Sequence, residues 1–132
     1  MANDLAVTLN ESTNPWLVDV DQKNNANHVA RNNQSQTITW QLSGNAAQGK
    51  IVGCNWVNNP PATNPPPAGI FGPFVIAPNG KSMTVTDLNN STSTTGDWIY
   101  QISVQLVDNG PIYQSGYVSI TGTATNPSIK NN

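Results

Sequence analysis

Charged side chains are scarce in this chain. Of its 132 residues only 9% are Asp, Glu, Lys or Arg, against about 25% in an average globular domain. The five basic residues are scattered along the sequence, whereas binding to a phosphate backbone requires clustered Lys and Arg. We therefore expect no nucleic-acid partner.

Cysteine, histidine and long apolar runs are also nearly absent. The single cysteine, Cys54, cannot form an internal disulfide, and with the single histidine, His28, it is too small a set for a zinc site. No apolar run approaches the ~20 residues of a membrane-spanning helix, and no basic segment followed by an apolar one opens the chain. The sequence predicts a cytoplasmic protein, with a removed leader or a non-classical route of secretion as the alternative, and it predicts no membrane partner and no cofactor.

A catalytic pattern is not visible either. His28 follows an Asn-rich polar stretch, and no Gly-x-Ser-x-Gly motif marks a nucleophile. The seven carboxylates show no spacing that would place two of them across a cleft, as a glycosidase requires. We therefore expect a protein that is not an enzyme and has no catalytic residues.

One pair of carboxylates deserves a metal hypothesis. Asp19 and Asp21 lie two residues apart, on the same face of an expected strand. Together with Asn24 or Asn25 they offer oxygen ligands of the kind that calcium prefers. The alternative is an exposed strand face beside a polar loop. We favour that alternative and expect no metal site.

What the chain does contain is neutral polar residues and alternating apolar ones. It has 20 Asn and 13 Thr, and its clearest pattern covers residues 97–107. One face of that stretch carries large apolar side chains, while the other is polar except for Ile99. The apolar set is Trp98, Tyr100, Ile102, Val104 and Leu106. A period of two predicts a strand with one buried face.

Similar alternation recurs along the chain. Residues 36–42 show it clearly, and residues 51–57 are expected to place Val52, Cys54 and Trp56 on one face. Asn-Gly pairs at 79–80 and 109–110 are typical of hairpin turns, and no helical periodicity is present. Phe71, Phe74, Val75 and Ile76 are expected to add to the core.

These patterns predict a single all-β domain over residues 1–132. Seven to eight short antiparallel strands with turns about every ten residues are typical of an immunoglobulin-like Greek-key β-sandwich, here without a disulfide. The inward side chains are expected to be Ile38, Trp40, Leu42, Cys54, Trp98, Tyr100, Ile102, Val104 and Val118.

Four segments resemble a known family. They are residues 13–18 (TNPWLV), 36–42 (QTITWQL), 83–87 (MTVTD) and 126–131 (NPSIKN). In their order and spacing they resemble the DP-EP family of small bacterial proteins. The resemblance implies a stand-alone immunoglobulin-like sandwich. It implies no established activity and leaves the function open.

Aromatic side chains supply the best functional hint. Trp16, Trp56, Tyr113 and Tyr117 lie near expected loops or strand ends, among many amides. Sugars stack on exposed aromatic faces, and Asn, Gln and Asp side chains hydrogen-bond to their hydroxyls. The alternative is that these rings only pack in the core or at its edge. Two functions therefore compete: a non-catalytic immunoglobulin-like domain acting through binding or structural contacts, and a carbohydrate-binding, lectin-like module.

Self-association is also expected. Residues 5–9, 16–20 and 113–123 are the expected edge strands, and the only charged side chain among them is Asp19. Charge, above all Lys, is the usual protection of a sheet edge. We therefore expect a homo-oligomer, most simply a two-fold dimer, formed by edge pairing or by a face that contains Trp16.

Overall fold

The chain forms an all-β structure. A computed structural model describes residues 3–58, 65–116 and 127–132, and within them are ten strands, three short 3₁₀ turns and no α-helix. The turns are η1 (Lys23–Asn25), η2 (Gly44–Ala46) and η3 (Thr92–Thr94). The strands are β1 (Asp4–Asn10), β2 (Leu17–Val20), β3 (His28–Val29), β4 (Gln36–Leu42), β5 (Lys50–Trp56), β6 (Val75–Ile76), β7 (Ser82–Asp87), β8 (Gly96–Gln105), β9 (Ile112–Gln114) and β10 (Ser128–Asn131).

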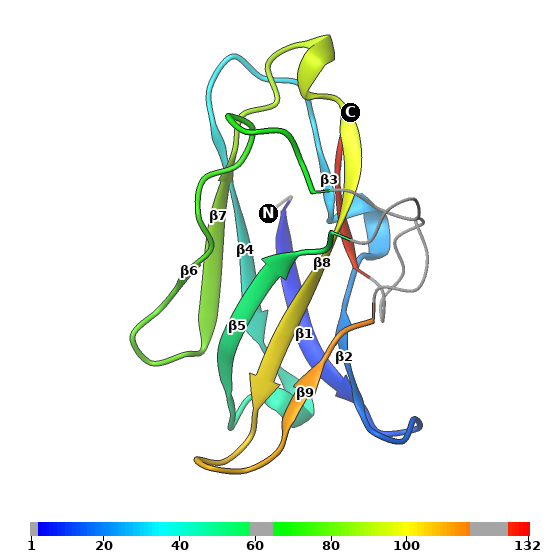
Figure 1. Cartoon of the computed structure of the whole chain (residues 1–132), viewed down its shortest axis with the longest axis vertical. Coiled ribbons are helices and arrows are strands. Elements are labelled where there is room, and N and C mark those ends of the chain that lie inside the picture. The colour runs from blue at the N-terminus through cyan, green and yellow to red at the C-terminus, as the bar shows by residue number, and fades with distance from the viewer. Residues whose placement is uncertain (1–2, 59–64, 117–126) are drawn as a thin grey trace.

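The strands follow one another in a single hydrogen-bonded path. Its order is β3-β10-β8-β9-β2-β1-β4-β7-β6, and β5 pairs with β8 outside that path. The path folds back on itself, so that β8 crosses in front of β1 in Figure 1. Buried side chains from both layers form one hydrophobic cluster between them. The arrangement is that of a β-sandwich, as the alternation predicts, and it has no disulfide because Cys54 is the only cysteine.

Strand number and direction differ from the prediction. There are ten strands rather than seven to eight, and three pairs are parallel: β1 with β4, β2 with β9, and β3 with β10. The extra strands are short, since β3 and β6 have two residues each, and a pair of residues is too short to show alternation. The parallel pairs join strands that are distant in sequence, which only the folded path brings together.

The predicted inward register holds for most of the core. Tyr100, Ile102 and Val104 on β8 are buried completely, and so are Ile38 and Trp40 on β4, with Leu42 nearly so. Cys54 and Trp98 are partly buried rather than fully enclosed. Ile99, the apolar exception on the polar face, is also buried at 1% exposure, so both faces of β8 are covered at this point. Val118 lies outside the described residues.

The expected register of β5 is wrong at its beginning. A β-bulge between Ile51 and Gly53 adds a residue to the strand opposite β8. Val52 therefore points outward and is 42% exposed, while Ile51 takes the inward place at 2%. An extra residue shifts the two-residue alternation by one step. Val75 also departs from expectation, since it is 56% exposed on β6 rather than in the core.

The expected sheet edges are wrong as well. β1 lies between β2 and β4, β2 lies between β1 and β9, and β9 lies between β8 and β2. Each of the three supposed edge strands therefore has a neighbouring strand on both sides, although β2 and β9 pair only through Leu17 and Gln114. The strands at the ends of the path are instead β3 and β6, and β5 pairs on one side only. The two ends of the path are therefore two-residue strands, whereas the outer strand β5 has seven residues.

Candidate functional site

Trp56 belongs to an aromatic cluster that packs between the layers. The ring centroids of Trp56 lie 4.5 Å from Phe71 and 5.0 Å from Phe74. Deeper in the same group, Trp40 donates a hydrogen bond from Nε1 to the Tyr100 hydroxyl at 2.7 Å. We call this set the aromatic cluster: Trp40, Trp56, Phe71, Phe74, Trp98 and Tyr100. Trp56 thus contributes packing and offers only a partly exposed ring to solvent.

Trp16 and Tyr113 form a second, separate aromatic group. Their rings are stacked, with centroids 5.4 Å apart and planes 24° from parallel. Both rings are half-buried. They precede the paired residues Leu17 and Gln114, where β2 meets β9 in parallel register. The stack therefore sits at the junction of the two layers, and it is the pair of predicted ligand-binding residues that the fold brings together. Tyr117 lies outside the described residues.

The neighbourhood of this stack is neutral and partly apolar. The β8–β9 hairpin that carries Tyr113 also exposes Val107 at 61% and Ile112 at 56%. Asn14, two residues before Trp16, is exposed, whereas Gln114 lies on the other face of β9 from Tyr113 and donates from Nε2 to Ser103 Oγ at 3.2 Å. The two rings are partly exposed and pack against the hydrophobic core. Such a pair is suited to contact with another molecule, although it also stabilises the junction by its own stacking.

The side chains that could act as nucleophile and base lie on different strands. Cys54 on β5 is packed against the core, and burial raises the pKa of its thiol, so the thiol stays protonated. Burial likewise raises the pKa of Tyr100. His28 lies on β3, opposite Lys130. The thiol lacks the low pKa and the adjacent base that nucleophilic catalysis requires.

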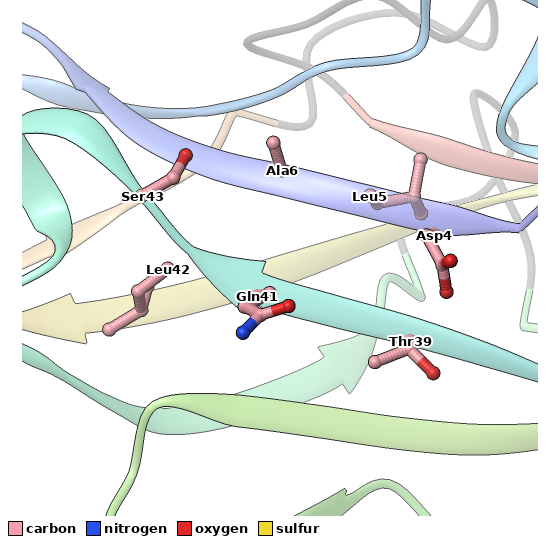
Figure 2. A pocket seen from close by; sticks show the side chains of 7 residues that line it. All are labelled: Asp4, Leu5, Ala6, Thr39, Gln41, Leu42 and Ser43. Atoms are coloured by element: carbon pink, nitrogen blue, oxygen red, sulfur yellow. The ribbon is translucent and has the colours of Figure 1, made fainter. Parts of the chain in front are cut away.

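Two adjoining hollows mark the outer face of the sheet formed by β2, β1 and β4. The first has a volume of about 380 Å³, and Figure 2 shows that β1 and β4 supply its walls. The second has a volume of about 310 Å³ and shares Ala6 and Ser43 with the first. Small Ala6 at the centre of β1 leaves the depression between longer neighbours. The lining side chains of the first are Asp4, Leu5, Ala6, Thr39, Gln41, Leu42 and Ser43.

Asp19 and Asp21 both line the second hollow. Burial raises the pKa of Asp19, and its Oδ1 atom is buried without a hydrogen-bond partner. Oδ1 of Asp21 accepts a hydrogen bond from the backbone N–H of Lys23 at 3.0 Å. Within residues 3–58, 65–116 and 127–132, no group of three or more His, Cys, Asp or Glu side chains comes together to hold a metal ion. The hollow offers hydrogen-bond acceptors.

Sequence reasoning missed a cluster of buried amides around β10. Asn27 donates from Nδ2 to the Ser128 carbonyl at 3.0 Å. Asn89 donates from Nδ2 to the carbonyls of Val29 and Asn132, at 2.9 and 3.0 Å. We call this set the amide cluster: Asn3, Asn27, Asp87, Asn89, Thr94, Ser128 and Asn131, all buried. No sequence signal separates these Asn residues from the loop Asn residues elsewhere.

Asp87 is the acidic member of the amide cluster. It ends β7 and is completely buried, and its Oδ1 accepts a hydrogen bond from Asn131 Nδ2 at 2.9 Å. Burial raises the pKa of this carboxyl to about 6, although the Asn131 hydrogen bond opposes part of the rise. A group that titrates so close to neutrality is a candidate for pH-dependent behaviour.

Comparisons with known proteins add no relative. Neither a family model, nor a curated protein, nor a solved structure matches this chain. The resemblance to the DP-EP family therefore stays a prediction. No helix in the described part of the chain is both long and apolar enough to span a membrane.

Proposed function

We propose that this protein is a non-catalytic, immunoglobulin-like domain that works through surface contact, and that the contact is centred on Trp16 and Tyr113. The stacked, partly exposed pair is the observation that carries the proposal. Aromatic residues are enriched at protein interfaces because they bury a large area at a small cost in side-chain entropy. The raised pKa of the partly buried Cys54 thiol supports the non-catalytic part.

The first partner to test is a second copy of the chain. In the described residues, each of the three expected edge strands has a neighbouring strand on both sides, although β2 and β9 pair only through Leu17 and Gln114. The face that contains Trp16 remains as the surface for a two-fold dimer. An interface on such a face is closed, because the same patch serves both subunits.

A carbohydrate is the second candidate partner. The observation that favours it is the stacked pair of rings, with the exposed amide of Asn14 two residues before Trp16. A sugar ring stacks on an aromatic face, and amides hydrogen-bond to its hydroxyls. The two rings already cover one face of each other, so a sugar would contact their remaining faces or edges.

Sedimentation velocity at micromolar concentration tests the first candidate, and an array of immobilised oligosaccharides tests the second. We expect a dimer that Trp16→Ala and Tyr113→Gln both convert to monomer, each with a near-ultraviolet spectrum showing a folded core. Val75→Ala is the matched control, since Val75 is an exposed apolar residue on β6.

The two partners give different outcomes in these measurements. Glycan binding by a monomer, lost in both variants, would replace the first candidate with the second. A monomer that binds no glycan would overturn the Trp16–Tyr113 surface as the site of function. Loss of dimer in the Val75→Ala control would place the interface on β6 instead.

A further inference from the structure

The contact between Asp87 and Asn131 leaves one oxygen of each side chain without a hydrogen bond. One hydrogen bond joins them, from Asn131 Nδ2 to Asp87 Oδ1 at 2.9 Å. Both side chains are completely buried. The second oxygen of each, Oδ2 of Asp87 and Oδ1 of Asn131, is buried and has no hydrogen-bond partner. Two acceptors are therefore left unsatisfied in one contact.

A single proton on Asp87 can give both of these oxygens a hydrogen bond. A buried acceptor without a partner costs about 1–3 kcal/mol, and a buried carboxylate without a cation costs more. A protonated carboxyl has one O–H donor. Protonated at Oδ2, Asp87 can donate to Asn131 Oδ1 while its Oδ1 still accepts from Asn131 Nδ2. The acid and the amide then form a pair with two hydrogen bonds.

No positive charge compensates the ionised form of Asp87. The strand β4, the turn η3 and the segment 65–74, whose Phe71 bridges to Asp87, contain no titratable residue, and Gln36 is the partner of Asp87 on β4. On β10, Lys130 is exposed and pairs in register with His28 and Asp97. Arg31 hydrogen-bonds to Thr95 Oγ1 at 2.9 Å. Of the described residues, only Asn131 hydrogen-bonds to the Asp87 carboxyl.

Asn131 is also an anchor of β10. Its Nδ2 donates a second hydrogen bond, to the Thr94 carbonyl at 2.9 Å. The strand lies between β3 and β8, as the red segment shows in Figure 1. Asp87 belongs to β7 in the other layer of the path. The protonation state of one carboxyl therefore bears on how firmly the last strand is held across the two layers.

We propose that Asp87 and Asn131 form a proton-dependent latch, which holds the C-terminal strand firmly in acid and less firmly toward neutral pH. The ordinary pKa of the carboxyl is 3.8, and in the folded protein it rises to about 6. Between these values the folded state binds a proton that the opened state lacks. The stabilisation is complete below the lower pKa and is lost as the pH rises through the upper one.

Hydrogen exchange of the backbone amides of residues 128–131 measures the latch directly. Corrected for intrinsic rates, their protection in the wild-type protein should fall about tenfold between pH 5 and pH 8. Asp87→Asn places a neutral amide opposite Asn131, which can make the same two hydrogen bonds at every pH. We expect its protection to be independent of pH and higher than that of the wild type at pH 8.

Two further measurements separate the latch from other causes. His28→Gln removes the single histidine, and it should leave the wild-type pH dependence unchanged. The carbon-13 shift of the Asp87 carboxyl should titrate near pH 6 in the wild type. Titration near 3.8, an Asp87→Asn variant with the wild-type slope, or loss of the slope in His28→Gln would each overturn the proposal.

Discussion

The aromatic cluster and the amide cluster occupy the same small sandwich and stabilise it by different means. In the first, six rings pack at centroid distances of 4.5 to 6.4 Å, and one side-chain hydrogen bond joins Trp40 to Tyr100. In the second, side-chain amides satisfy the backbone groups of β10 and its neighbours. Ring packing is non-directional and tolerates small shifts, whereas each amide must meet a particular partner. The fold therefore combines one region that tolerates small shifts of its side chains with another in which each side chain needs a particular hydrogen-bond partner.

The aromatic cluster should give the largest loss of stability on truncation. Trp40→Ala leaves a large cavity at a completely buried position and should lower the free energy of unfolding by about 3–5 kcal/mol. Chemical denaturation measures it. Trp98→Ala is the comparison, because Trp98 is only partly buried and should cost clearly less. Equal losses in the free energy of unfolding would show that burial does not decide how much each ring of the cluster contributes to stability.

The amide cluster should give the next largest effect. Asn89→Ala removes two donors to backbone carbonyls and the acceptor of the Thr94 hydroxyl, and it should cost about 2–3 kcal/mol. The neighbouring Asn90→Ala, at an exposed position, should change stability little. The denaturation midpoints of the two variants test this expectation. Equal midpoints would show that the buried Asn89 contributes no more to stability than the exposed Asn90.

A smaller change probes the one polar contact inside the aromatic cluster. Tyr100→Phe keeps the ring but leaves the buried Trp40 N–H without its acceptor at 2.7 Å. We expect a loss of about 1–2 kcal/mol in the free energy of unfolding. A neutral result in the same denaturation experiment would show that packing alone holds this cluster.

The smallest effect should come from the bulge of β5. Val52 is 42% exposed, so Val52→Thr should alter stability by less than about 0.5 kcal/mol. The neighbouring Ile51 is only 2% exposed. Ile51→Thr is therefore the matched variant and should be clearly destabilising. The opposite ranking would restore the register expected from simple alternation.

The two clusters also differ in how far the sequence predicts them. The alternation around Tyr100 and Ile102 identifies the buried face of β8, because burial of every second side chain leaves a repeating pattern. Asn89 and Asn131 leave no such pattern, since a buried structural Asn and a solvated loop Asn are the same letter. The hydrogen-bond partners of Asn89, Val29 and Asn132, are distant in sequence, and only the folded path brings them together.

The candidate site was predictable in part for the same reason. The sequence pattern predicts that Trp16 and Tyr113 lie near strand ends, but the stacking of their rings depends on the β2–β9 pairing. That pairing is a single parallel step between segments far apart in the chain. Trp56 resembled them in sequence and lies instead among Phe71 and Phe74. Local sequence cannot separate a ring at the rim from a ring in the core.

The placement of the short strands has a consequence for how this weakly charged chain behaves when concentrated. Fibrils grow when a long, straight row of unsatisfied backbone groups recruits an identical chain and is renewed by each addition. In the described residues, β3 and β6 offer two residues each, and the free side of β5 is interrupted at Val52. These free strand edges are either only two residues long or interrupted by a bulge. Any assembly of this protein should therefore stop at a defined size and remain dispersed, even with a net charge of only −2.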